Sequence, residues 1–162
     1  MDKLIEARIN AAGIRLGEHV PPRYRYVSFT RAGDIAYFSG KTSVAVGSLQ
    51  SRTGKAGRDV TVDEAGEAAR LCAISLLSAI EFGVGLERVK GILKLTGFVA
   101  SDPDFSEQAV VVDHASRLLV DVLGEAGWHA RTAIGVAVLP GDATVELEAV
   151  VQLTSHVEEA QA

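Results

Sequence analysis

The spacing of apolar residues changes several times along this chain, and each change predicts a new secondary-structure element. After Thr61, apolar residues recur every three or four positions, which is the period of an amphipathic helix. Thr61 is followed three residues later by Glu64, the pattern of a capping box, so we expect the helix to begin there. Its apolar stripe consists of Val62, Ala65, Ala69, Cys72, Leu76 and Ile80. Gly83 and Gly85 are expected to end it.

The rest of the pattern predicts two further helices and five strands. In chain order these are a short helix over 2–12, strands over 24–30 and 35–39, a buried strand over 89–99, a helix that follows Asp102-Pro103 and ends near Gly124, and two strands within 129–151. Residues 43–57 are rich in Gly, Ser and Thr and are expected to form a loop. The order β-β-α-β-α-β-β predicts an α+β fold in which two helices pack on one face of a mixed sheet.

The last two strands flank Leu139-Pro140-Gly141-Asp142 and are predicted to form an antiparallel hairpin. If Val138 pairs with Ala143, the alternation of side chains divides the hairpin into two faces. The core face would hold Thr132, Ile134, Val136 and Val138 beside Val145, Leu147, Ala149 and Val151. The opposite face would hold Arg131, Ala133, Gly135 and Ala137 beside Glu146 and Glu148. Such a face could hold a small anionic ligand.

Arg131 is the leading candidate for a ligand-binding residue. Its guanidinium is permanently charged, and its planar fork matches a carboxylate with two parallel hydrogen bonds. The small residues at 133, 135 and 137 leave room above the strand for a ligand or for another chain. The alternative interpretation is an arginine that only protects a solvated sheet edge.

Length and charge narrow the classes of function. The 162 residues fit one domain over 1–162, with an N-terminal helical extension over 1–20 and a flexible tail over 155–162. A formal charge of -5 argues against a surface that follows nucleic-acid phosphates. A single cysteine, Cys72, excludes an internal disulfide and favours a reducing cytoplasm. No apolar run is long enough for a membrane span, so no membrane partner is expected.

Signatures of metal and cofactor binding are missing from the sequence. His19, His114, His129 and His156 lack the mutual spacing of a metal site, and there is neither a Walker-type loop nor a dinucleotide fingerprint. We therefore predict no metal and no organic cofactor.

Several short motifs occur together between Tyr24 and Leu153. They are Tyr26 ahead of Arg31-Ala32-Gly33-Asp34, Phe38-Ser39-Gly40, Phe98-Val99 before Asp104-Phe105, Ala130-Arg131-Thr132, Leu139-Pro140, and Val145-Glu146-Leu147-Glu148-Ala149. In this combination the chain resembles the RidA or YjgF-like family of reactive intermediate deaminases, some members of which are labelled endoribonuclease L-PSP. The resemblance implies a chorismate-mutase-like homotrimer with ligand sites between subunits. It also implies hydrolysis of reactive enamines or imines, such as 2-aminoacrylate, to keto acids and ammonia.

The resemblance also assigns roles to residues of this chain. Arg131 would grip the substrate carboxylate, Glu146 would position or activate water, Tyr26 would line the pocket, and the Gly40 backbone would hold a ligand oxygen. The substrate-binding set implied in this way is Tyr26, Ser39, Gly40, Asp113, Arg131 and Ala133. Glu148 lies two residues from Glu146, so either carboxylate could be the acting one. In the predicted register Arg131 and Glu146 are roughly 13 Å apart, which also favours a site completed by a second subunit.

The chain departs from the pattern of the best-known deaminases at four positions. Ala133 and Gly135 stand where those proteins carry Cys and Glu, Asp113 stands near the place of a pocket Asn, and Lys41 stands where Gln is frequent. These changes predict a wider, differently charged pocket and a divergent subgroup.

Two other functions are compatible with the same residues. One is a non-catalytic trimer that binds small carboxylated metabolites or a partner protein in the cleft between subunits. The other is ribonuclease activity, which only the inherited label suggests and which the acidic charge and the lack of a histidine pair disfavour.

Overall fold

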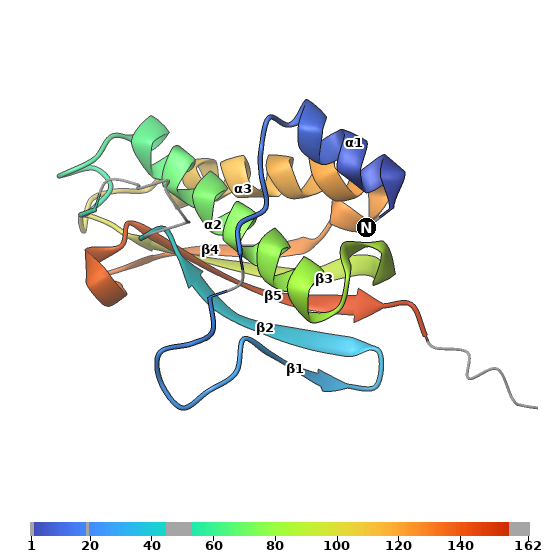
Figure 1. The fold of residues 1–162 in the computed structure, drawn as a ribbon. Coiled ribbons are helices and arrows are strands. Elements are labelled where there is room, and N and C mark those ends of the chain that lie inside the picture. The colour runs from blue at the N-terminus through green and yellow to red at the C-terminus, as the bar shows by residue number, and fades with distance from the viewer. Residues whose placement is uncertain (1, 19, 45–52, 156–162) are drawn as a thin grey trace, which may run out of the picture.

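A computed structural model of the chain describes residues 2–18, 20–44 and 53–155 (Figure 1). In chain order the helices and strands are α1 (Lys3–Ala11), β1 (Phe29–Ala32), β2 (Ile35–Thr42), α2 (Val62–Gly83), β3 (Val89–Ala100), α3 (Gln108–Leu123), β4 (Ala130–Val136) and β5 (Val145–Leu153). Most of the tail predicted over 155–162 and residues 45–52 of the predicted loop lie outside the described residues.

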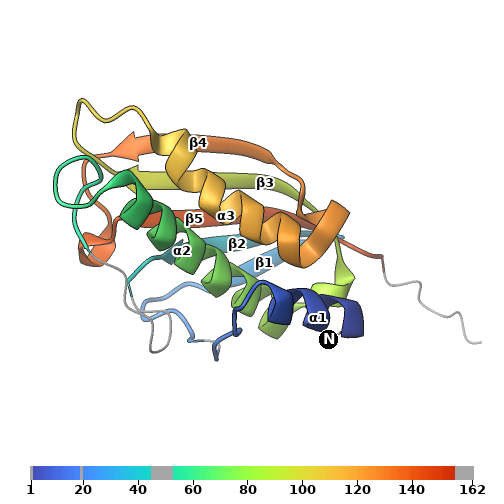
Figure 2. The same ribbon diagram turned by 90° about the horizontal axis from the view of Figure 1, so that it is seen from above.

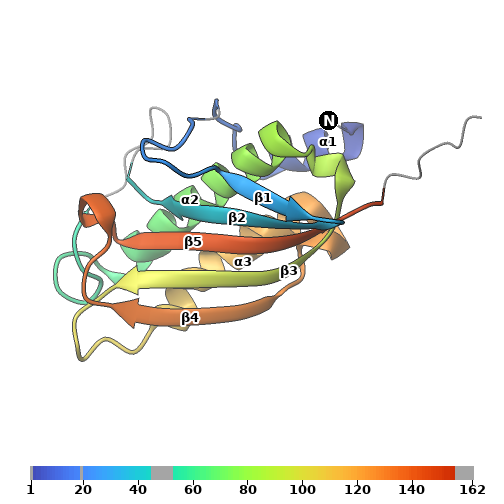
Figure 3. The same ribbon diagram turned by 90° about the horizontal axis from the view of Figure 1, so that it is seen from below.

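The five strands form one mixed sheet in the order β1-β2-β5-β3-β4, as the view from below makes clear (Figure 3). β1 and β2 form the predicted first hairpin, although β1 covers Phe29–Ala32 rather than the predicted 24–30. β5 runs antiparallel to both β2 and β3. β4 is an edge strand that runs parallel to β3, and α3 provides the connection between them. This parallel pair is what makes the sheet mixed.

The predicted closing hairpin is wrong, because β3 lies between β4 and β5. Arg131 is paired with Leu95 of β3, and Leu95 is paired in turn with Ala149 of β5. The Pro-Gly turn does exist, and Gly141 and Asp142 both have positive φ angles of 64° and 57°. It returns the chain across the end of β3 rather than to the neighbouring strand. A connection between two parallel strands must cross over the sheet, and α3 provides this crossover from β3 to β4. β4 therefore pairs with β3, the strand that precedes it in the chain.

The inserted strand also inverts the predicted faces of β4. Leu95 and Val99 are fully buried and lie opposite Arg131 and Gly135, so the odd-numbered residues of β4 are on the helix side. Thr132, Ile134 and Val136 therefore share the uncovered face with Glu146 and Glu148. The face predicted for β5 is confirmed, since Val145, Leu147, Ala149, Val151 and Leu153 are buried.

All three helices lie on one side of the sheet, as predicted for α2 and α3 (Figure 2). The capping box of α2 is confirmed: Thr61 Oγ1 accepts from the Glu64 backbone N–H at 3.2 Å, and Glu64 Oε2 accepts from the Thr61 N–H at 2.9 Å. α3 begins at Gln108, several residues after the predicted Asp102-Pro103 start. α1 packs against α3, and its Ile5 and Ile9 are buried.

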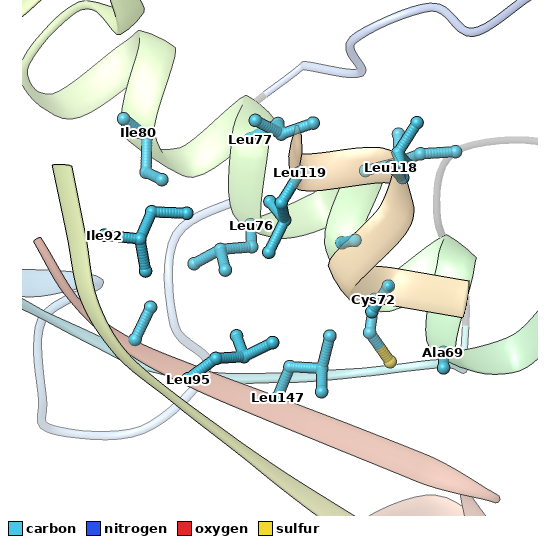
Figure 4. Close-up of a cluster of buried hydrophobic side chains, with 14 of the residues drawn as sticks. Ala69, Cys72, Leu76, Leu77, Ile80, Ile92, Leu95, Leu118, Leu119 and Leu147 are labelled. Carbon is cyan, nitrogen blue, oxygen red and sulfur yellow. The ribbon is translucent and has the colours of Figure 1, made fainter. Parts of the chain in front are cut away.

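The core fills the space between α2, α3 and the sheet (Figure 4). Leu76 and Leu119 descend from the two helices, and Leu95 and Leu147 rise from the sheet; all four side chains are fully buried. Cys72 also points to the sheet, and its Sγ donates a hydrogen bond to the Val145 carbonyl at 3.3 Å. Burial of apolar surface on this side holds the helices in place and leaves the other side of the sheet uncovered.

Candidate functional site

Arg131 is the second residue of the edge strand β4, and its side chain turns toward α3. Its Nη1 donates to Asp113 Oδ1 at 3.3 Å and to Ser116 Oγ at 3.1 Å, and its Nη2 donates to the Ala109 carbonyl at 3.2 Å. The side chain is 26% exposed. The guanidinium is therefore held in one orientation by α3, and the interpretation of Arg131 as a solvated edge guard is wrong.

Asp113, predicted to bind substrate, lies beside Arg131. It accepts a hydrogen bond from Arg117 Nε at 2.7 Å in addition to the longer one from Arg131. Burial acts to raise the pKa of Asp113, but the hydrogen bonds and charges of the two arginines outweigh it and hold the pKa below its usual value. Asp113 is thus a carboxylate at neutral pH and partly neutralises Arg131.

Two further polar residues, Ser116 and His129, complete this cluster. Ser116 Oγ is 3.0 Å from His129 Nε2, and His129 Nδ1 is 2.6 Å from the Gly127 carbonyl oxygen. Neither residue was predicted to be functional. A sequence signal existed for Ser116, which follows Asp113 by three residues and so shares its helix face, but nothing in the sequence placed His129 opposite it.

The cluster lines a pocket of about 400 Å³ between α3 and the start of β4. Its wall is formed by Asp113, Ser116, Arg117, Val120, Asp121, Trp128, His129 and Arg131. We refer to these residues as the arginine pocket. It can accommodate a small metabolite, with the guanidinium of Arg131 at one side.

A second cluster lies on the uncovered face of the sheet, around a β-bulge in β2. Phe38 pairs with Ala149 and Lys41 with Leu147, so Ser39 and Gly40 stand together opposite Glu148. A Cβ at residue 40 would overlap Oε1 of Glu146. Only glycine therefore allows the Glu146 side chain to lie against the bulge.

The bulge also determines the surroundings of Glu146 and Tyr26. Burial raises the pKa of Glu146, and the charge of Glu148 raises it further. Ser39 Oγ donates to the Val27 carbonyl at 2.7 Å, which ties the segment that carries Tyr26 to the bulge. The structure thus brings Ser39, Gly40 and Glu146 together, with Tyr26 on the adjoining loop. We refer to these four residues as the bulge cluster.

Gly135 makes room for another side chain. A Cβ at residue 135 would lie 2.8 Å from Gln108 Nε2 and 2.8 Å from Ser101 Oγ. Gln108 is fixed there by a 2.7 Å hydrogen bond that its Nε2 donates to the Phe105 carbonyl. Ala133 is partly buried against the core. The amide of Gln108 thus occupies the space beside β4 that a longer side chain at position 135 would need.

The arginine pocket and the bulge cluster lie on opposite sides of the sheet. The Cα atoms of Arg131 and Glu146 are separated by two strand spacings and three residues, or about 14 Å. The prediction that both side chains share one face is wrong for the reason given above, the insertion of β3. Within one chain these two residues cannot contact the same small molecule.

Two features are absent from the part of the chain that the structure describes. Among residues 2–18, 20–44 and 53–155, no group of three or more His, Cys, Asp or Glu side chains is arranged to hold a metal ion. In the same part of the chain, no helix has the length and apolar character needed to cross a membrane.

Comparison with known proteins identifies the family. Residues 6–153 match the family described as "YjgF/chorismate mutase-like, putative endoribonuclease". The chain belongs to the YjgF/chorismate mutase-like family. It is 40% identical over 154 residues to protein TCP17 of Trypanosoma cruzi, a match that covers 93% of this chain and 95% of that protein.

Two solved structures support the same conclusion for this YjgF-like chain. A protein of unknown function from Agrobacterium tumefaciens, Atu1372, is 41% identical, with a TM-score of 0.83 and coverage of 93% of this chain and 92% of that one. A Shewanella oneidensis protein described as "a putative endoribonuclease" is 29% identical, with a TM-score of 0.86. That match covers 92% of this chain and 99% of the other. The predicted family and its chorismate-mutase-like fold are confirmed.

Proposed function

We propose that this YjgF-like protein is a cytoplasmic homotrimer that hydrolyses reactive enamines and imines of small carboxylated metabolites to keto acids and ammonia. The site would form where the β4 edge of one subunit meets the uncovered sheet face of the next. It would combine the arginine pocket of the first subunit with the bulge cluster of the second. The observation that carries this proposal is Arg131, a permanently charged fork held at the rim of a pocket of about 400 Å³.

The uncovered sheet face supports association with another copy. Tyr37 is 51% exposed and Ile134 43% exposed on this face, although both are large apolar side chains. Exposed apolar surface of this kind favours a partner. The bulge cluster lies on this uncovered face, and Arg131 lies on β4, the strand at the edge of the sheet. A subunit that covered the face would therefore come close to both.

Arg131 is suited to hold a substrate carboxylate. Its bond to Asp113 is long, at 3.3 Å, while Asp113 keeps a 2.7 Å bond from Arg117. A ligand carboxylate could therefore replace Asp113 at Nη1 without leaving Asp113 unpaired. Two charge-assisted hydrogen bonds to a planar carboxylate would fix the ligand in one orientation.

Glu146 is suited to the chemistry at the other end of the ligand. A carboxyl with a raised pKa is a better proton acceptor than an ordinary one, so it can remove a proton from an attacking water. The carbon of a protonated C=N bond is already electrophilic, and the reaction then needs orientation, water and proton transfer. An enamine reaches this form by taking a proton from water at its β-carbon. Water then adds to the C=N carbon as Glu146 removes its proton, and Glu146 passes that proton to the amino nitrogen. The C–N bond of the carbinolamine breaks as its hydroxyl loses a proton, which releases the keto acid and ammonia.

The proposal is tested by ammonia release from 2-aminoacrylate generated in situ by a serine dehydratase. Arg131→Ala and Glu146→Gln should each lower the rate of ammonia release above the spontaneous background by about 10²-fold. This is the scale expected for loss of a charge-assisted anchor or of a general base. Arg58→Ala is the matched control. The Arg58 side chain is 56% exposed, is paired with Asp59, and belongs to neither the arginine pocket nor the bulge cluster. Unchanged activity of Arg131→Ala would exclude Arg131 as the anchor.

A mixing experiment tests whether the site is shared. Arg131→Ala and Glu146→Gln chains are each nearly inactive alone, but averaged over trimers assembled at random from an equal mixture, about one site in four would join two native halves. Activity should then return to about a quarter of the native rate. No recovery in trimers shown to be mixed would exclude a site between subunits.

Gly135 favours a second candidate, a non-catalytic binder that uses the same cleft. The best-known deaminases of the RidA family carry Glu at the position of Gly135. In this chain the amide of Gln108 lies in the space beside Gly135. Calorimetry with a keto acid distinguishes the two: binding that Arg131→Ala abolishes, without ammonia release by the native protein, supports the binder.

A further inference from the structure

Ser116 and His129 form a hydrogen-bonded pair whose proton positions follow from their neighbours. His129 Nδ1 is 2.6 Å from the Gly127 carbonyl oxygen, which only accepts hydrogen bonds. In the neutral ring Nδ1 therefore carries the proton, and Nε2 has the free electron pair. Ser116 Oγ, at 3.0 Å, donates its proton to Nε2. In this orientation an imidazole can remove the proton of a nucleophilic hydroxyl.

The charges around the pair favour the same reaction. Arg131 Nη1 lies 3.1 Å from Ser116 Oγ and donates to it, so negative charge that develops on this oxygen is stabilised. Burial lowers the pKa of His129, and the charge of Arg131 lowers it further against the opposite effect of the Gly127 carbonyl. His129 is thus neutral at pH 7 and able to accept a proton.

The pair opens into the arginine pocket, which can receive a substrate. Trp128, 71% exposed, and Val120 give the pocket an apolar wall. The charged groups of its lining are balanced: they are Arg117, Arg131, Asp113 and Asp121. A lining without net charge suits a neutral acyl group that packs against the indole.

We propose that Ser116 and His129 are a catalytic dyad for acyl transfer, which hydrolyses small neutral carboxylic esters in the arginine pocket. Ser116 Oγ attacks the ester carbonyl as its proton passes to His129 Nε2. The ester C–O bond then breaks, and the same proton leaves with the alcohol. Water attacks the acyl-serine, gives a proton to Nε2, and releases the acid as Oγ recovers that proton. This activity depends on Ser116 and His129, while the proposed imine hydrolysis depends on Glu146, so the two proposals fail separately.

The first experiment asks where the native protein becomes acylated. The full chain is mixed with p-nitrophenyl acetate, and the burst of p-nitrophenol is followed before digestion and mass spectrometry. We expect a burst of about one equivalent per chain and an acetyl group on Ser116. An acetyl group found only on other residues, or no burst, would overturn the proposal.

Variants then separate a nucleophile from a serine that only orients Arg131. Ser116→Ala and His129→Gln should each slow the burst at least about 100-fold, the usual contribution of a general base or more. Ser116→Cys keeps a nucleophile beside His129 and should retain the burst with the acetyl group on residue 116. Ser75→Ala, which changes another partly buried helical serine, is the matched control and should behave as the native protein.

The pH profile gives a readout that an orienting role would not affect. The native burst should require neutral His129 and reach half of its maximum below pH 6.5, the ordinary pKa of histidine. The charged groups that share the pocket with His129 are Arg131, Arg117, Asp113 and Asp121. A burst independent of pH between 5 and 8, or a Ser116→Ala variant that reacts at the native rate, would exclude the dyad.

Discussion

Gly97 determines how closely α3 packs on the sheet. A Cβ at residue 97 of β3 would lie 2.5 Å from Cγ2 and 2.9 Å from Cγ1 of Val112, and 3.3 Å from Leu147 Cδ2. Val112 and Leu147 are fully buried, so neither can turn out to solvent. Gly97→Ala should therefore push α3 away from β3 at a cost of about 2 kcal/mol, the usual scale of an overpacked core.

A double-mutant cycle isolates this contact. Val112→Ala removes two buried methyl groups and should also cost about 2 kcal/mol. In the double variant the new methyl group at 97 occupies part of the space left at 112. We therefore expect a total loss of about 2 rather than about 4 kcal/mol, which is a coupling of about 2 kcal/mol. For a chain of this size each single variant should melt about 4–8 °C below the native protein.

The measurements are urea unfolding followed by circular dichroism, and ammonia release. Asp113 and Ser116 follow Val112 in α3, so Gly97→Ala should also displace them from Arg131 and reduce activity. The double variant should be no less stable than either single variant and should regain activity. Losses that simply add to about 4 kcal/mol would refute the idea that Gly97 is required by the close approach of α3.

Three other outcomes are expected. Thr61→Ala removes the capping box with Glu64 and should lower the free energy of unfolding by about 1 kcal/mol in urea titrations. Gly40→Ala should displace the Glu146 side chain and reduce ammonia release while the far-ultraviolet circular dichroism spectrum stays native. Because burial raises the pKa of Glu146 in the fold, its contribution to stability is full below pH 4.5 and is lost as the pH rises through the folded pKa. Glu146→Gln should therefore melt above the native protein at pH 7, and this difference should disappear at pH 4 in thermal scans.

The helices could be predicted well because their signals are local. The Thr61–Glu64 box and the apolar stripe that follows it specify where α2 begins and which side it buries. The start of α3 was placed too early, because Asp102-Pro103 is a typical helix-opening pair but here belongs to the loop before Gln108. Local chemistry marks a change of direction there without giving the residue at which the helix starts.

The order of the strands could not be predicted from neighbouring residues. The turn at Gly141 indicated a reversal of the chain, and that part was correct. Which strand β4 pairs with depends on β3, a segment about 40 residues earlier, and no local pattern specifies such a contact. One inserted strand was enough to move Arg131 to the other face.

The site was predicted in part for the same reason. Arg131 was predicted from its charge and its place in a strand, Asp113 was predicted through the family resemblance, and the structure brings them together. Ser116 and His129 were missed because their contact joins the middle of a helix to the start of a strand. The resemblance gave roles to both Glu146 and Gly40, and the structure places these two residues side by side. The predicted face of Arg131 was wrong.

The position of Cys72 makes the core accessible to a simple kinetic measurement. It is the chain's single thiol, it has no exposed surface, and burial raises its pKa well above the ordinary range. A disulfide reagent can therefore modify it only in moments when α2 separates from β5. The labelling rate of the native protein, in plain buffer, thus reports how often this separation occurs, and it would rank the Gly97 and Val112 variants without any denaturant.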